Sequence, residues 1–156
     1  MSLYRKTVPH DGFRVLRELE KDIFVFTSNV DGAFQKAGFD ESGELCEVHG
    51  SIHHLQCSKS CTSAIWSADC EIRVDESEMK ADMDTVPRCP KCNSVARPNI
   101  LMFNDWHWIS TRTSEQTAQM HRVLENSSDV VVIDLGSGTA VQTCRQTGEQ
   151  VTQLYE

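Results

Sequence analysis

The sequence predicts an α/β fold in which a partial parallel β-sheet, flanked by helices, carries a small zinc-ribbon insert. Two short apolar runs, residues 23–26 and 130–133, have the continuous hydrophobicity of strands that are buried on both faces. Two cysteine pairs interrupt the chain between these runs at spacings typical of zinc ligands. We therefore expect residues 1–50 and 97–156 to form the α/β domain and residues 51–96 to form the insert.

Composition narrows the class of protein. The 156 residues carry a net charge of −8, which argues against nucleic acid as a partner because phosphate binding needs a basic footprint. No run approaches the roughly 18 apolar residues of a membrane span. The N-terminus lacks the apolar core of a signal peptide, so the expected location is cytoplasmic. In that reducing compartment the seven cysteines favour metal binding over disulfides.

The N-terminal segment predicts a helix followed by a strand. Residues 11–21 place Phe13, Leu16 and Leu19 on one stripe, as an amphipathic helix does. The apolar run 23–26 then predicts the first strand of the parallel sheet.

Polar side chains follow directly on that strand. Open α/β sheets bind ligands just past the carboxyl ends of their strands, which is where Ser28, Asn29 and Asp31 lie. Asn29 can donate and accept hydrogen bonds, and Asp31 can accept them from ribose hydroxyls. Asn29 and Asp31 are equally suited to cap the short helix expected over residues 33–37. The spacing leaves both interpretations open.

A second short strand, expected over residues 46–48, ends on His49 and Gly50. A histidine is suited to general acid–base chemistry because its ordinary pKa is near neutral. A lone histidine is more often a satisfied structural residue, but the strand end and the adjacent glycine favour a functional role.

The cysteine pairs are Cys57-x-x-x-Cys61 and Cys89-Pro-Lys-Cys92. Together they offer four thiolates, the ligand set of a closed tetrahedral zinc site. Two alternatives are buried free thiols, which pack as small hydrophobes, and disulfides. The acidic stretch 66–87 between the pairs is expected to be a solvated excursion, and the remaining cysteines are expected to be core or surface thiols: Cys46, Cys70 and Cys144.

The C-terminal half predicts three further elements. Pro98 favours an extended residue before it, so a strand is expected over residues 97–103, followed by an aromatic and polar stretch, 104–108. That stretch is either a loop with partly buried tryptophans or an edge that contacts substrate. A helix is expected over residues 114–126, with Ser114 as N-cap.

The last predicted strand, 130–133, leads into a glycine-bearing turn that contains Gly136 and Ser137. Backbone amides in such a turn can approach a phosphate or a ribose. By itself this is a weak signal, because glycine turns after strands are common and the full Gly-x-Gly-x-x-Gly pattern is absent.

Taken in order, these segments resemble the sirtuin family of NAD-dependent protein deacylases, over most of residues 9–143. The family has Thr-Gln-Asn-Ile-Asp, His-Gly, two cysteine pairs, Phe-Gly-Glu and Gly-Thr-Ser. The corresponding segments here are Thr27-Ser28-Asn29-Val30-Asp31, His49-Gly50, the two cysteine pairs, Arg97-Pro98-Asn99 leading to Phe103-Asn104-Asp105, and Gly136-Ser137-Gly138.

The resemblance implies a Rossmann-like domain, a structural zinc and an enzyme that transfers the acyl group of an acyl-lysine protein or peptide to ADP-ribose, with release of nicotinamide from NAD. His49 would be the base that deprotonates a ribose hydroxyl. The resemblance further implies cofactor contacts from Ser28, Asn29, Asp31, Gly136 and Ser137, substrate contacts from Phe103, Asn104 and Asp105, and zinc ligation by Cys57, Cys61, Cys89 and Cys92.

The chain also departs from the family pattern. Residues 1–22 contain no match to the family's Gly-Ala-Gly turn or its Pro-Asp-Phe-Arg loop, so the chain is expected to be a sirtuin truncated at both ends. Ser28 is shorter than the family's glutamine. The alternative function is therefore a non-catalytic, zinc-stabilised binding module, or an inactive sirtuin-like fragment that lacks the phosphate-binding loop. A cysteine–histidine hydrolase is disfavoured because the cysteines come in ligand pairs.

Overall fold

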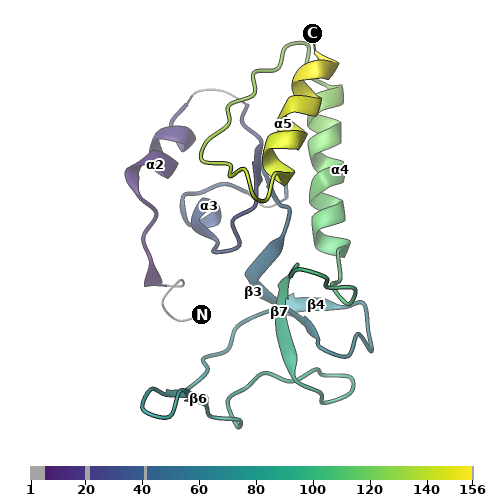
Figure 1. Cartoon of the computed structure of the whole chain (residues 1–156). Helices are drawn as coiled ribbons and strands as arrows, with labels where there is room; N and C mark the ends of the chain where they lie inside the picture. Colours follow the sequence, from purple (N-terminus) through teal and green to yellow (C-terminus); the bar gives the residue numbers. More distant parts are fainter. Residues whose placement is uncertain (1–5, 20–21, 41, 156) are drawn as a thin grey trace.

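The computed structural model describes residues 6–19, 22–40 and 42–155. The helices gather at one end of the molecule and the antiparallel strands at the other, and β3 (Gly50–Cys57) leads from one end to the other (Figure 1). The α/β fold with a cysteine cluster confirms the expected fold class. No helix within the described ranges is long and apolar enough to cross a membrane.

A parallel pair of strands forms the sheet of the helical end. β1 (Val25–Thr27) pairs with β2 (Leu45–Glu47), with Val25 opposite Leu45 and Thr27 opposite Glu47. All of β2 is buried, and α4 (Thr111–Glu125) packs against it, with Cys46 Sγ 3.6 Å from Thr117 Oγ1. Val25 and Phe26 are only half-buried, so the expectation that this first strand is buried on both faces was wrong.

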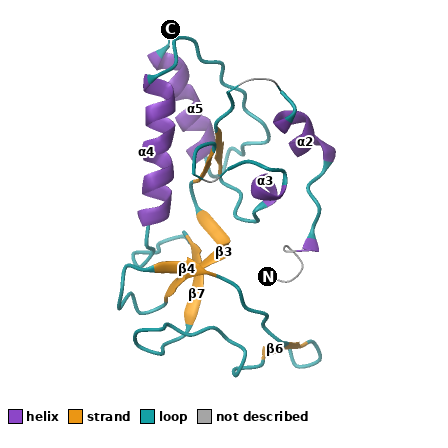
Figure 2. Ribbon diagram, turned by 180° about the vertical axis from the view of Figure 1, so that it is seen from behind, coloured by secondary structure: helices purple, strands orange, loops and turns teal. Residues whose placement is uncertain are grey.

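The other end of the molecule is a three-stranded antiparallel sheet. Its order is β4 (Ile65–Ser67), β3, β7 (Ala96–Ile100) (Figure 2). Its small core consists of buried side chains from β3, β7 and the residue after β4, with two half-buried side chains packed against them: Leu55, Ala96, Ala68, Trp66 and Cys70.

The stretch between the cysteine pairs is a largely exposed excursion, as expected. It contains a short hairpin of β5 (Val74–Asp75) and β6 (Lys80–Ala81), both exposed. Arg73 closes the base of the hairpin, because its Nε and Nη2 both donate to Asp82 Oδ2, at 2.9 and 2.6 Å.

Two short helices pack together near the N-terminus. α2 (Asp11–Arg17) is capped by the His10 side chain and ends before the predicted residue 21; residues 20–21 lie outside the described ranges. α3 (Ala33–Lys36) confirms the short helix expected there. An edge-to-face ring contact joins the helices, because Phe34 of α3 lies 4.8 Å from Phe13 of α2, centroid to centroid. Phe34 makes a second such contact, at 5.5 Å, with Phe39 just after α3.

The predicted strand at 130–133 does not form. These residues are irregular, and Val131 is 85% and Ile133 64% exposed. Strand propensity alone is insufficient, because an extended segment needs a neighbour for its backbone hydrogen bonds. Within the described residues β1 pairs only with β2, so the parallel sheet does not extend to this run.

The helix bounds in the C-terminal half also differ from expectation. α4 starts at Thr111 with Ser110 at its N-cap, so Ser114 is not the cap: its N–H donates to the Ser110 carbonyl at 2.8 Å. Contacts from the first turn of α4 to β2, described below, hold the helix over these earlier residues. α5 (Thr143–Leu154) was not predicted, since threonines and a glycine weaken its local helical signal. It lies beside α4 (Figures 1 and 2), and the Tyr155 hydroxyl donates to the Leu124 carbonyl.

Candidate functional site

The four cysteines of the two pairs come together. Their sulfur atoms all lie within 4.8 Å of one another, with Cys57 Sγ 3.6 Å from Cys92 Sγ and Cys61 Sγ 3.5 Å from Cys89 Sγ. A tetrahedral zinc with Zn–S bonds of about 2.3 Å separates its sulfurs by about 3.8 Å. The cluster therefore has the dimensions and the ligand set of a structural zinc site.

The thiols of this cluster influence one another. A hydrogen-bonded contact with Cys92 raises the pKa of Cys61 to about 12, whereas a hydrogen bond with Ser94 lowers the pKa of Cys92 to about 6. Four thiols this close resist simultaneous ionisation, and a divalent cation at their centre stabilises all four thiolates. Histidines are not part of the cluster among the described residues, because His53 Nε2 instead lies 3.0 Å from the Asp31 carbonyl oxygen.

His49 lies where the two ends of the molecule meet. The N–H of Val48 donates to the Thr27 carbonyl at 2.9 Å, which joins the residue before His49 to the end of β1. The N–H of Leu101 donates to the His49 carbonyl at 2.9 Å, which joins His49 to the end of β7. The imidazole is half-buried, and this burial lowers the pKa of His49 below its ordinary value, so the ring is neutral at neutral pH.

Only glycine fits directly after His49. Gly50 has φ of +81°, and a Cβ there would lie 2.0 Å from the carbonyl oxygen of Asn99. The close approach of β3 to β7 at this point therefore requires the glycine of the His-Gly dipeptide.

The predicted cofactor residues near β1 form a loop beside His49. Asp31 Oδ1 accepts from the Ala33 N–H at 3.0 Å, but the N-cap of α3 is Gly32, so Asp31 binds the first residue of the helix without being its cap. The loop is fixed from β3, because the Ile52 N–H donates to the Val30 carbonyl at 2.9 Å. Ser28 and Asn29 are exposed. The Ser28 hydroxyl, the Asn29 amide and the second carboxylate oxygen of Asp31 can therefore act as donors and acceptors for a ligand. This set fits an amide and a hydroxyl of a ligand.

The glycine turn that contains Gly136 and Ser137 is bonded to α5. Gly136 is exposed with φ of +72°. The N–H and the hydroxyl of Ser137 donate to Asp134 within the turn, and its carbonyl accepts from α5. Arg145 of α5 donates to the Ser137 carbonyl at 2.9 Å and pairs with Asp134 at 3.3 Å. In the described part of the chain no hydrogen bond or ion pair connects Gly136 or Ser137 to His49 or to the loop after β1.

The predicted substrate edge follows β7, which ends at Ile100 rather than at residue 103. Phe103 is 87% exposed, Asn104 is exposed with φ of +57°, and Asp105 is bound by Arg97 at 2.7 Å. Trp106 is 91% exposed and Trp108 half-buried, so only one of the two tryptophans is partly buried.

Sequence reasoning missed the contacts that fix β2. Arg112 Nη2 lies 2.5 Å from Glu47 Oε2, and both side chains are almost fully buried. The Thr113 hydroxyl donates to the Glu47 carbonyl at 3.2 Å, and the Glu47 N–H donates to Gln116 Oε1 at 3.1 Å. The start of α4 thus holds the N–H, the carbonyl and one carboxylate oxygen of a residue two positions before His49. The only local signal was a carboxylate within an otherwise apolar strand.

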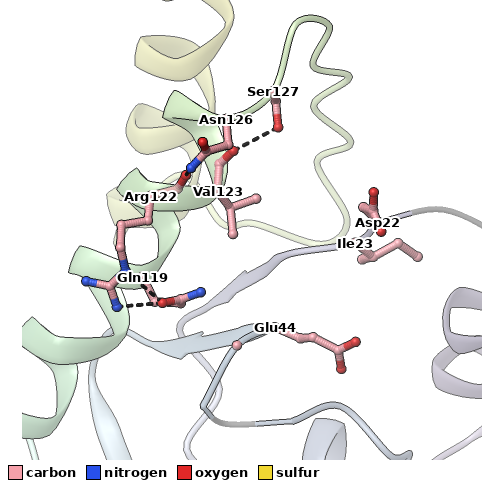
Figure 3. A pocket seen from close by; sticks show the side chains of 9 residues that line it. Asp22, Ile23, Glu44, Gln119, Arg122, Val123, Asn126 and Ser127 are labelled. Atoms are coloured by element: carbon pink, nitrogen blue, oxygen red, sulfur yellow. Dashed lines mark hydrogen bonds between the residues drawn. The ribbon is translucent and has the colours of Figure 1, made fainter.

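A hollow of about 540 Å³ has none of the predicted site residues in its lining. Figure 3 shows the residues that line it. Its lining comes from the residues that precede β1 and β2, from the C-terminal half of α4 and from the two residues after that helix: Asp22, Ile23, Gly43, Glu44, Gln119, Arg122, Val123, Asn126 and Ser127. Parallel sheets bind ligands at the carboxyl ends of their strands, and this hollow is at the amino ends. It is therefore not the expected cofactor site.

Known proteins are similar to this chain in sequence and in fold. The chain is 32% identical over 108 residues to an NAD-dependent protein deacetylase of Bacillus cereus, a match that covers 67% of this chain and 38% of that protein. It is 32% identical over 104 residues to the NAD-dependent protein deacetylase sirtuin-3 of Mus musculus, covering 65% of this chain and 28% of that one. The chain thus spans well under half the length of these relatives.

Solved structures extend the fold similarity over almost the whole chain. The structure of Sir2Tm bound to a propionylated peptide superposes with a TM-score of 0.64 at 23% identity, covering 98% of this chain and 58% of that one. The family model described as Sir2 family matches residues 2–143. With the match running from before α2 to the first residue of α5, the chain belongs to the Sir2 family, the sirtuins.

Proposed function

We propose that this chain contributes the catalytic histidine and the zinc-binding insert of an NAD-dependent protein-lysine deacylase. The observation that carries the proposal is the position of His49. Its carbonyl accepts from Leu101 just after β7, and the preceding residue, Val48, donates to the Thr27 carbonyl at the end of β1. The names of the Bacillus and mouse relatives, both NAD-dependent protein deacetylases, support the same activity.

The residue roles follow from this placement. NAD, when bound, supplies the ADP-ribose that accepts the acyl group. His49, neutral because burial lowers its pKa, takes a proton from a ribose hydroxyl. Asn29 and Asp31 offer an amide and a carboxylate oxygen to the nicotinamide and its ribose, with Ser28 beside them.

The substrate, an acyl-lysine protein or peptide, would lie along Phe103, Asn104 and Asp105. Asp105 is fixed by Arg97. Phe103 and Asn104 are exposed and so accessible to a peptide. Cys57, Cys61, Cys89 and Cys92 would hold a structural zinc. We further propose that residues 1–50 and 97–156 form the cofactor-binding part and residues 51–96 the insert, and that the protein works in the reducing cytoplasm, which its seven free cysteines favour.

One observation favours a second function, a zinc-stabilised binding module without turnover. The apolar run before Gly136 does not join the parallel sheet, and Gly136 and Ser137 have no bond to the His49 region within the described residues.

Nicotinamide release by the zinc-loaded chain, given NAD and an acetyl-lysine peptide, separates these functions. We expect release in the wild-type chain, its loss in His49→Ala, and its retention in His121→Ala, which removes an exposed histidine of α4. A folded, zinc-loaded chain that releases no nicotinamide contradicts the enzyme proposal. Peptide binding measured in that same sample would then support the binding module.

A further inference from the structure

Residues next to the first cysteine pair, Cys57 and Cys61, bind the segment 103–109, which begins with the predicted substrate edge. Gln56 precedes Cys57 and Ser60 precedes Cys61 in the sequence. Gln56 Nε2 donates to the His107 carbonyl at 2.8 Å, and Ser60 Oγ donates to the same carbonyl at 3.2 Å. Two residues adjacent to metal ligands therefore converge on one backbone oxygen of the segment 103–109.

The Gln56 side chain also binds the end of that segment. It is fully buried, and its Oε1 accepts from the Ile109 N–H at 3.1 Å and from Asn99 Nδ2 at 2.8 Å. Asn99 Nδ2 in turn donates to the Ile109 carbonyl at 2.8 Å. A buried polar network of this kind is stable only while its members stay aligned, because each unpaired group would carry its full desolvation cost.

A second anchor holds the start of the segment. Arg97 lies opposite Gln56 in the β3–β7 ladder and binds both carboxylate oxygens of Asp105, at 2.7 and 2.9 Å. Between the two anchors the segment presents Trp106 to solvent. Both anchors thus depend on the end of β3 that leads into Cys57.

We propose that occupancy of the four-cysteine site sets the conformation of residues 103–109, and that Gln56 and Ser60 are the positioning residues that transmit it. A metal ion fixes Cys57 and Cys61 to Cys89 and Cys92, and so fixes the loop in which Ser60 adopts φ of +49°. Loss of the ion frees this loop and misaligns both donors. That this segment faces substrate rests on the proposed function, whereas the coupling itself does not.

Amide hydrogen–deuterium exchange of the full, zinc-loaded chain tests the positioning residues. Ser60→Ala removes one donor to the His107 carbonyl, and we expect exchange in residues 104–109 to accelerate about three- to tenfold. Ser58→Ala is the matched control, since Ser58 is exposed in the same loop and its hydroxyl makes no hydrogen bond within the described residues. Both variants are expected to bind zinc with wild-type stoichiometry.

Gln56→Met keeps the side-chain length while removing both the donor and the acceptor, so we expect an acceleration larger than that of Ser60→Ala. If this variant does not fold, Ser60→Ala carries the test alone. Wild-type exchange at residues 104–109 in Ser60→Ala overturns the assignment of Ser60, and wild-type exchange in a folded Gln56→Met overturns that of Gln56.

Chelation tests the metal dependence in the same chain. We expect residues 104–109 to lose protection on zinc removal and to regain it on zinc addition, while the remote α5 retains its protection. If residues 57–61 lose protection and residues 104–109 do not, the coupling is wrong. Because no arm involves NAD or turnover, failure of this inference and failure of the proposed deacylase activity are separate results.

Discussion

At the scale of single residues, two side chains near the end of β2 have environments with measurable consequences. His49 is half-buried, and burial lowers its pKa because the charged form loses hydration. Glu47, two residues earlier, is buried as a charged group because Arg112 compensates it. The environment of His49 affects both proton transfer and the pH dependence of folding, and that of Glu47 affects folding stability.

We predict that His49 gives folding stability a specific pH dependence. Its pKa is lower in the folded than in the unfolded chain, so the unfolded chain gains protons first as the pH falls below about 6.5. The free energy of unfolding should therefore decrease between about pH 7 and pH 5, and His49→Gln should flatten part of that decrease. Urea unfolding across this range measures the effect, with His121→Gln as the control for an exposed histidine.

The same lowered pKa predicts the pH–rate profile. If His49 is the base, kcat/KM should fall on the acidic side with a midpoint below about 6.5, because only neutral imidazole accepts the proton. An acidic limb centred above that value would be inconsistent with the environment of His49.

The Glu47–Arg112 pair gives the second residue-scale prediction. Arg112→Met leaves a buried carboxylate without its cation, so we expect a loss of about 3 kcal/mol in the free energy of unfolding. Arg122→Met, which removes an exposed arginine from the same helix, should change it by less than about 0.5 kcal/mol.

The double variant Glu47→Gln/Arg112→Met completes the comparison. It removes both charges, so we expect it to recover much of the stability that Arg112→Met loses. Equal losses in the single and double variants would show that the cost came from packing rather than from the unpaired charge.

At the scale of elements, the turn between β2 and β3 determines how closely the two ends of the molecule approach. The backbone of Gly50 lies against Asn99 of β7, and the carbonyl of His49 accepts from Leu101 just beyond that strand. A side chain at position 50 would push β3 and β7 apart next to the candidate base.

We therefore predict that Gly50→Ala destabilises the protein by about 3 kcal/mol or more, because it combines a left-handed φ with a steric clash against backbone. Gly43→Ala is the matched control: no atom lies within 4 Å of its would-be Cβ, and its effect should stay within about 0.5 kcal/mol. Chemical denaturation of both variants with zinc present gives the comparison, and equal midpoints would contradict the close approach.

At the scale of the whole molecule, the antiparallel end has few buried apolar side chains, and its two cysteine loops are brought together at the four-sulfur cluster. A metal ion that binds only the folded state adds its binding free energy to folding. Stability of the whole chain should therefore depend on metal occupancy.

We predict one zinc per chain and a decrease in melting temperature of about 5–10 °C on chelation, the shift expected when the ion is present at about 100 times its dissociation constant. Cys89→Ser should abolish stoichiometric zinc binding, whereas Cys144→Ser, a thiol outside the cluster, should retain it. A melting curve insensitive to chelator at several pH values would count against a structural zinc.

Local sequence determined the features whose partners lie within a few residues. Two or three residues separate the members of each cysteine pair, and Asp31 bonds an amide two residues away. Such short-range geometry is set by chain stereochemistry, so residue spacing predicts it. The short helix at Ala33–Lys36 followed from the same kind of local signal.

Only the tertiary structure decided the contacts and strands that depend on distant partners. Glu47 meets Arg112 across 65 residues and Gln56 meets Asn99 across 43, and neither pairing has a local signature. The apolar run 130–133 has the composition of a strand but lies outside the sheet, and the weakly patterned α5 is a helix beside α4. A strand needs a neighbour for its backbone hydrogen bonds and a buried charge needs its counter-ion, and only folding decides whether each is supplied.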